Sequence, residues 1–206
     1  MTITGIYTLK DESKAVYKEK NSEFIAYTFP VVNIEEFNQK LAGLKKEFYD
    51  ARHHCYALKL KNSTFKYSDD GEPNGTAGIR IYNAIEHFKL TDAAVIVIRY
   101  FGGVKLGVGP LGKAYYTAAE NAINSAIVIE KNPYYKLYIQ TDINMISPVF
   151  NLLARFNAHI LEQDYIEGIG ITLHLPYEKL EEFKKEIITL TRDKYKLTLD
   201  EEIMYL

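Results

Sequence analysis

The segment that most constrains the fold is AAVIVIRYF at residues 93–101, an almost unbroken apolar run. The run is too short to cross a membrane, which takes roughly 20 apolar residues in a helix. It therefore predicts a strand that is buried on both faces of a sheet. A long helix follows, and its small side chains would let helix and sheet approach closely along a stripe of Leu111, Ala114, Tyr115, Ala118, Ala122 and Ala126.

The first part of the chain alternates short strand patterns with helical ones. The spacing predicts strands at residues 4–10, 14–22, 23–32 and 53–60. Asn33 is placed to cap a helix that carries Phe37, Leu41, Leu44 and Phe48. Ile81, Ile85 and Phe88 have the spacing of one helix face and predict a second helix. No internal repeat or low-complexity segment interrupts this order.

A domain boundary is predicted at EKNPYY, residues 130–135, where a helical pattern stops at a turn. We expect one domain at 1–130 and another at 135–206. The second reads β-α-β-β-α-β, the ferredoxin-like order, with Ser147 as N-cap of its first helix and Pro148 in the first turn. One face of its sheet would lie open, with Thr172 and His174 pointing outward to meet a partner or the first domain.

Charge divides unequally between these two parts. The whole chain has a net charge of −2, which argues mildly against a protein that coats nucleic acid non-specifically. Residues 1–133 hold 17 Lys and Arg against 15 Asp and Glu, whereas residues 134–206 hold 8 against 12. Contact with a polyanion should therefore favour a local patch in the first part.

A single cysteine, Cys55, excludes an internal disulfide framework and fits a reducing compartment. The first residues show no apolar signal-peptide core, so we expect a cytoplasmic protein with no membrane contact.

Three segments could carry chemistry, and the first is ARHHCYA at residues 51–57. In a strand, His53 and Cys55 share one face while His54 points to the other. Two ligands on one face are too few for a structural zinc site without help from elsewhere. The pattern favours a buried thiol beside packed histidines over a metal site or a catalytic cysteine.

The second segment is YSDDGEPNGTAG at residues 67–78. Its turn dipeptides lead to Thr76, a candidate N-cap, and small residues then leave the first helical N–H groups open to an anion. The carboxylates of Asp69, Asp70 and Glu72 would repel an anion unless a divalent cation bridged the carboxylates and the anion. Taken alone, the segment favours a turn into a capped helix.

The third segment is RYFGGVKLGVGPLG at residues 99–112, where Arg99 ends the buried strand and Lys105 lies among glycines. Such a loop suits a phosphate, but it equally suits tight packing. The glycine spacing does not match the dinucleotide-binding fingerprint.

Together, RHHCYAL, YSDDGEPNGTAG and VIVIRYFGGVKLGVGPLGKAY resemble the YigZ/IMPACT family (UPF0029) over most of residues 1–130. The second domain is similar to the DUF1949 domain of the bacterial branch. The resemblance implies an α+β protein whose first domain is an α/β sandwich like domain IV of elongation factor G, a ribosomal protein domain 2-like fold. It implies a link to translation and brings no established catalytic residues.

We hypothesise that the three segments converge on one concave surface that binds RNA, the ribosome or a translation factor, without catalysis, and regulates translation, including under stress. Its candidate residues are Arg52, His54, Asn74, Gly75, Thr76, Gly78, Arg99, Tyr100, Phe101, Gly102, Gly103 and Lys105. Lys113 and Tyr67 are further candidates for contacts with phosphates and bases.

Two alternatives stay open at this point. A hydrolase of phosphorylated or nucleotide substrates would hold a divalent cation on Asp69, Asp70 and Glu72, with Arg99 and Lys105 on the phosphate. A protein adaptor would instead use the open sheet face of residues 134–206. Otherwise no cofactor is expected.

Overall fold

The computed structural model describes residues 3–206, which divide into two compact units. The N-terminal unit spans Ile6–Glu130, and the C-terminal unit holds Lys131–Leu206 together with residues 3–5. Within the described chain, no helix is long and apolar enough to span a membrane.

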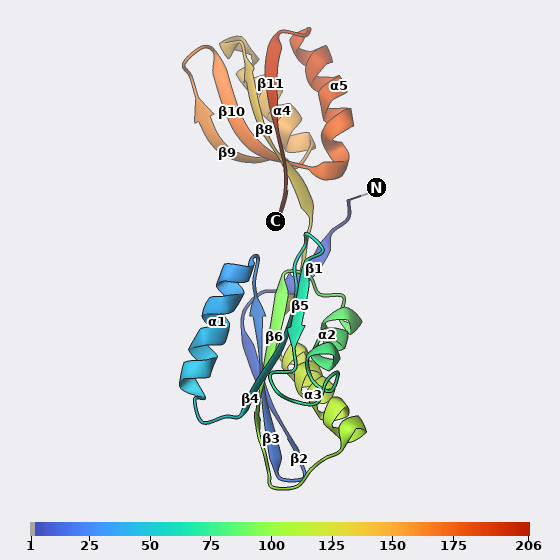
Figure 1. Ribbon diagram of the computed structural model, residues 1–206. Coiled ribbons are helices and arrows are strands. Elements are labelled where there is room, and N and C mark those ends of the chain that lie inside the picture. The colour runs from blue at the N-terminus through green and yellow to red at the C-terminus, as the bar shows by residue number, and fades with distance from the viewer. Residues whose placement is uncertain (1–2) are drawn as a thin grey trace. The chain divides into compact units, whose positions relative to one another are not determined.

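The N-terminal unit is built on a five-stranded antiparallel sheet with the order β2-β3-β6-β4-β5 (Figure 1). Its central strand is β6 (Ala93–Tyr100), in which every residue but the last is buried. The prediction of a strand buried on both faces is therefore confirmed. The flanking strands are β2 (Ser13–Glu19), β3 (Ser22–Pro30), β4 (His53–Lys59) and β5 (Phe65–Ser68).

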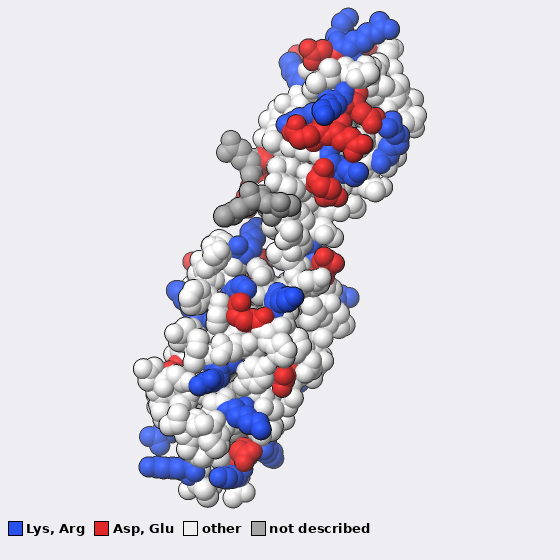
Figure 2. Space-filling model, turned by 90° about the vertical axis from the view of Figure 1, so that its right-hand side faces the viewer, with Lys and Arg blue, Asp and Glu red and all other residues white. Residues whose placement is uncertain are grey.

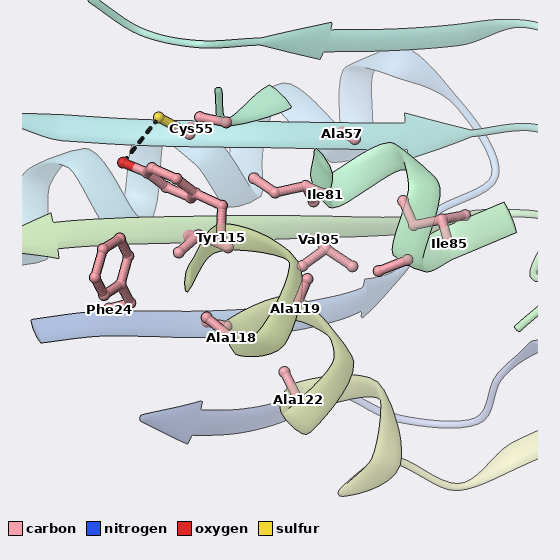
Figure 3. Packing of buried hydrophobic residues seen from close by; sticks show 14 of the residues in the cluster. Phe24, Cys55, Ala57, Ile81, Ile85, Val95, Tyr115, Ala118, Ala119 and Ala122 are labelled. Carbon is pink, nitrogen blue, oxygen red and sulfur yellow. Dashed lines mark hydrogen bonds between the residues drawn. The ribbon is translucent and has the colours of Figure 1, made fainter. Parts of the chain in front are cut away.

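Helices cover both faces of this sheet, with α1 (Ile34–Glu47) on one side and α2 (Gly78–His87) and α3 (Val108–Asn124) on the other (Figure 1). Asn33 caps α1 as predicted, because its side chain accepts a hydrogen bond from the Glu36 N–H at 2.8 Å. The alanines of α3 point to the sheet and allow close packing (Figure 3). A buried apolar cluster therefore fills each face of the sheet.

Two short strands outside the main sheet pair with each other at the ends of the N-terminal unit. They are β1 (Ile6–Leu9) and β7 (Val128–Lys131). The N–H of Lys10 also donates to the Ile127 carbonyl at 2.8 Å. The strand predicted at residues 4–10 is thus present, and it ties the start of this unit to the chain that follows α3.

The C-terminal unit has the element order β-α-β-β-α-β, as the sequence predicts, in an antiparallel sheet ordered β11-β8-β10-β9. Apolar side chains on one sheet face pack under its two helices. Its elements are β8 (Pro133–Thr141), η1 (Ile143–Met145), α4 (Ile146–Arg155), β9 (His159–Asp164), β10 (Ile169–Pro176), η2 (Tyr177–Lys179), α5 (Leu180–Thr191) and β11 (Tyr195–Tyr205).

Two sequence expectations for this unit need correction. Ser147 is not an N-cap, because the chain enters α4 through η1, and Asp142 caps η1 by accepting from the Asn144 N–H at 2.8 Å. His174 does not point into open solvent, since it is only 7% exposed, whereas Thr172 lines a groove on that face. Burial lowers the pKa of the His174 imidazole.

Candidate functional site

The carboxylate of Asp69 closes the turn at residues 67–78 and caps helix α2. One of its oxygens, Oδ1, accepts from the Ala77 N–H at 2.9 Å and the Gly78 N–H at 2.8 Å, and Oδ2 accepts from the Gly75 N–H at 2.9 Å. A negative charge at a helix N-terminus satisfies free donors and the helix dipole together. Asp69 therefore occupies the place that the sequence left open for an anion.

Thr76 is not the N-cap of this helix, which corrects the sequence interpretation. Its hydroxyl donates to the Pro73 carbonyl at 2.6 Å, and the residue is 1% exposed. Local spacing predicts a cap at Thr76, immediately before the helix. The N–H groups of Ala77 and Gly78 instead donate to Asp69, which lies eight and nine residues before them. The local pattern therefore identified the helix start but assigned the capping group to the wrong side chain.

The three acidic residues of the turn do not converge on one point. The Oδ2 atom of Asp70 accepts from the backbone N–H of His54 at 2.6 Å, and its Oδ1 lies 3.7 Å from the Lys45 ammonium. Asp69 holds the helix start, and Glu72 turns into the interior. Within residues 3–206, no group of three or more His, Cys, Asp or Glu side chains is arranged to hold a metal ion.

The centre of the site is a buried ion pair between Glu72 and Arg99. The Arg99 Nη1 lies 2.5 Å from the Glu72 Oε1, and the two side chains are 6% and 4% exposed, respectively. The hydroxyl of Tyr115 donates to the same oxygen at 2.7 Å, and the Nε2 of His53 lies 4.0 Å from it. The buried carboxylate of Glu72 thus meets two donors, the Arg99 guanidinium and the Tyr115 hydroxyl.

Cys55 lies at the back of this network as a protonated thiol. It is fully buried, and its Sγ donates to the Asp69 carbonyl at 3.0 Å and contacts the Tyr115 hydroxyl at 3.3 Å (Figure 3). Burial strongly raises the pKa of Cys55 and also that of Tyr115. A thiol of this kind is a poor nucleophile, in agreement with the interpretation as a packed cysteine.

The two histidines of β4 point to opposite faces, as the strand alternation predicts. His53 lies on the side of Cys55, with its Nδ1 2.8 Å from the Asp70 carbonyl. His54 is 6% exposed beside the end of α1, and burial lowers the pKa of its imidazole. His54 therefore cannot share a surface with the residues that surround Arg99.

A pocket of about 290 Å³ opens beside the ion pair, between the turn and the start of α3. Most of its wall is apolar, although Lys105 and the ion pair contribute charged groups. The ring of Phe101 is 47% exposed, and the Arg99 Cζ lies 5.6 Å from its centre. We call this the Arg99 pocket; it is lined by Glu72, Pro73, Arg99, Phe101, Lys105, Leu106, Gly107, Val108 and Leu111.

The glycine loop that forms this pocket is anchored on the hairpin between β2 and β3. Lys20 and Asn21 both have positive φ angles, 45° and 64°, as a two-residue hairpin turn requires. Gly102 lies against this turn, where a Cβ would come within 2.1 Å of the Asn21 backbone. Its N–H donates to the Ser22 hydroxyl at 3.2 Å, and the Arg99 Nη2 reaches the same oxygen at 3.4 Å.

The structure brings only part of the sequence-predicted surface together. Glu72, Arg99, Phe101 and Lys105 line one pocket, whereas His54 lies on the other side of the sheet. The hypothesis of a single surface holding all the candidates is therefore wrong. Seven further candidates do not line the pocket. Arg52 and Asn74 are exposed, Thr76 and Gly78 are buried, and Tyr100 donates its hydroxyl to Asp50 at 2.7 Å. Gly75 and Gly103 also lie outside the lining, as does an eighth candidate, Gly102, which packs on the hairpin turn.

Two residues that shape the site, Tyr115 and Ser22, were not predicted from the sequence. Tyr115 was counted in the alanine-rich stripe, but a hydroxyl in such a stripe needs a partner and finds Glu72. Ser22 supports both Arg99 and Gly102 from a distant hairpin. The need of the Tyr115 hydroxyl for a partner could have been inferred from the sequence. No residue near Ser22 in the sequence indicates that it contacts Arg99 and Gly102.

Comparisons with known proteins cover both units. Residues 20–123 match the family described as Impact N-terminal domain, and residues 139–194 match the Domain of unknown function (DUF1949). An IMPACT family member of Haemophilus influenzae is 32% identical over 188 residues, covering 87% of this chain and 90% of the relative. The IMPACT family member YigZ of Escherichia coli is 28% identical over 187 residues, covering 89% and 92%.

More distant and structural matches agree. The Protein IMPACT of Rattus norvegicus is 29% identical over 119 residues, covering 55% of this chain and 36% of that protein. A solved structure described as the crystal structure of a hypothetical protein matches with a TM-score of 0.69 and 26% identity, covering 98% of this chain and all of that one. The chain therefore belongs to the IMPACT family, in the two-domain form in which an Impact N-terminal domain precedes a DUF1949 domain.

Proposed function

We propose that the N-terminal unit binds RNA of the translation machinery and that the protein regulates translation by binding rather than by catalysis. The observation that carries the proposal is the exposed loop at the mouth of the Arg99 pocket. This loop presents a cation, Lys105, between exposed apolar side chains: Phe101 is 47% exposed, Val104 49% and Val108 67%. Cations for phosphates and aromatic rings for bases are what RNA contact needs.

The distribution of charge supports the same unit as the RNA-binding part. The first 133 residues hold 17 basic against 15 acidic residues, and the remainder holds 8 against 12. On the visible face in Figure 2, Lys and Arg side chains are spread over the N-terminal unit with few acidic ones among them. The likeness to domain IV of elongation factor G that the sequence suggests fits a ribosomal partner.

Binding is favoured over hydrolysis because the reactive groups already have partners. The hydrolase alternative requires Asp69, Asp70 and Glu72 to hold one cation, but each carboxylate contacts a different part of the unit. The thiol of Cys55 stays protonated because burial raises its pKa. A general base or nucleophile would need a pKa matched to its task.

The test is co-sedimentation of the full chain with ribosomes and their subunits across a salt series. The variant Lys105→Glu/Lys113→Glu changes two exposed cations around the start of α3. If each contacts a phosphate, we expect affinity to fall about tenfold or more and the salt dependence to weaken by roughly one unit of slope per lost contact. Arg99 is unsuitable for this test, because its loss would leave Glu72 buried without its cation.

Lys46→Glu is the matched control, since it reverses an exposed charge on α1, on the other face of the sheet. Loss of binding in the double variant with retention in Lys46→Glu supports the proposal. Equal loss of ribosome binding in both variants would indicate attraction by the overall charge of the protein rather than contact at a defined site. No binding at low salt would reject ribosomal RNA as the partner and leave a translation factor to be sought.

A further inference from the structure

We propose that the Arg99 pocket receives one unpaired base of single-stranded RNA, with preference for a base that carries an exocyclic amino group. This inference rests on the proposed RNA binding and adds the chemistry of the ligand. The pocket is lined by two charged side chains, Glu72 and Arg99, that are more than nine-tenths buried and are therefore held in place by the fold. Its volume of about 290 Å³ leaves room for one base.

The first requirement of a base site is an aromatic platform, and Phe101 supplies it. Its ring is 47% exposed and lines the pocket. The Arg99 guanidinium contacts two rings, with its Cζ 5.3 Å from the centre of Phe24 and 5.6 Å from that of Phe101. Cation–π contact of this kind holds Phe101 in place, so its exposed surface is ready to stack on a base.

The second requirement is a group that distinguishes base edges, and Glu72 fits it. Arg99 and Tyr115 both contact the Oε1 atom of Glu72. Neither of these contacts uses Oε2, and Glu72 lines the pocket, so its carboxylate is placed to accept from a ligand. A carboxylate oxygen attracts the amino group of cytosine, adenine or guanine and repels the O4 carbonyl of uracil.

The third requirement is a place for the phosphate beside the base. Lys105 lines the pocket and is exposed, and helix α3 begins immediately after Gly107. Within residues 3–206, no side chain is found to accept from the first N–H groups of α3, those of Val108 and Gly109, which remain as donors. The Nε of Arg99, which is buried on the same wall, has no hydrogen-bond partner among the described residues and adds to the positive potential.

These charges favour a nucleotide over an apolar peptide side chain as the occupant. A peptide side chain would need only the walls formed by Leu106, Val108 and Leu111. It would gain nothing from Lys105 or from an uncapped helix start. A base with its phosphate uses the aromatic ring, the carboxylate and the cations together.

The experiment measures binding of the full chain to three eight-residue oligonucleotides by fluorescence anisotropy at fixed salt. They are an all-cytosine RNA, an all-uracil RNA and an abasic chain of the same charge. Cytosine and uracil have the same size and differ at the amino-bearing edge. We expect the cytosine oligonucleotide to bind about tenfold more tightly than the uracil one, and the abasic chain to bind most weakly.

Phe101→Ala should lose at least about tenfold in affinity for cytosine RNA and leave binding of the abasic chain unchanged. Because Phe101 is half-exposed, this variant keeps the buried ion pair, and its far-UV circular dichroism should match that of the parent. Tyr49→Ala is the matched control, since Tyr49 is an aromatic residue, 84% exposed, in the turn after α1. It should behave as the parent protein does.

Equal affinity for all three oligonucleotides would overturn the base pocket while leaving phosphate-mediated ribosome binding intact. Failure to bind any oligonucleotide, with ribosome co-sedimentation preserved, would also overturn it. Failure of both experiments would reject RNA binding as a whole. Preference for uracil over cytosine would contradict the role given to Glu72.

Discussion

The interiors of the two units are built on different principles. The N-terminal unit buries an ion pair, Glu72 with Arg99, and connects it to Tyr115 and Cys55. In the C-terminal unit the described interior is an apolar cluster with a few buried polar residues, such as His174, and its Arg155–Glu186 ion pair is more exposed, at 64% and 33% of the two side chains. A buried ion pair contributes little net stability, because desolvation offsets its attraction. Stability alone therefore does not account for the buried pair, which lies on the wall of the pocket for which we propose RNA binding.

The largest effect should come from removing one partner of each ion pair. Arg99→Ala leaves Glu72 buried without its cation and should destabilise the N-terminal unit by about 3–5 kcal/mol. Arg155→Ala should change the C-terminal unit by less than about 1 kcal/mol, because its pair is in contact with water. Hydrogen exchange of β6 and β8 amides reads each unit separately. Comparable losses in the two variants would refute the contrast between the interiors.

A smaller effect is expected for the two aspartates that cap helices. Asp69→Ala removes the acceptor of three backbone N–H groups and should cost about 2 kcal/mol. Asp142→Ala removes a single backbone partner at η1 and should cost about 0.5 kcal/mol. Urea unfolding of the two variants, followed by circular dichroism, provides the measurement. A larger loss for Asp142→Ala would show that Asp69 is not the main support of its turn.

The smallest effect is a shared sensitivity to acid. Burial lowers the pKa of His54 in one unit and of His174 in the other, so each imidazole takes up a proton at lower pH in the folded protein than in the unfolded chain. Unfolding returns each imidazole to a pKa of about 6.5, so below that pH the unfolded chain binds more protons. The stability of both units should therefore be full above about pH 6.5 and fall as the pH drops towards the folded pKa.

Variants at these histidines separate the two contributions. His54→Gln should flatten the pH dependence of the N-terminal unit between about pH 5 and 7, and His174→Gln that of the C-terminal unit. Hydrogen exchange measured at several pH values provides the readout. Nearby charges also enter, because Asp70 raises the pKa of His54 whereas Lys136 and His159 lower that of His174. If the dependence of stability on pH is unchanged in either variant, that histidine does not contribute to the acid sensitivity of its unit.

Local patterns were sufficient for much of the fold. The apolar run of β6, the alanine stripe of α3 and the cap at Asn33 each depend on residues a few positions apart. The element order of the C-terminal unit was readable for the same reason. Strand alternation places Thr172 and His174 on the same face of the sheet. Only packing across the sheet determines that His174 is buried whereas Thr172 lines a groove.

The site was less readable because its contacts are distant in sequence. Glu72 meets Arg99 after 27 residues and Tyr115 after 43. An acidic residue in a polar turn with several glycines is expected to be exposed to solvent, and only the fold shows that Glu72 points inward. From the sequence, Asp69 in the same turn is equally available to a cation, but its carboxylate accepts hydrogen bonds from the start of α2.

The anchoring of Gly102 on the hairpin turn implies an order of events during folding. The hydrogen bond from Gly102 to Ser22 joins residues 80 positions apart, and the backbone at Asn21 forms the surface on which the glycine rests. A β-hairpin closes within microseconds, whereas a contact across so long a chain segment forms late. We therefore expect the β2–β3 hairpin, on which the glycine loop rests, to form first, and the Arg99 pocket to be completed only when β6, the last strand of the sheet in sequence, is in place.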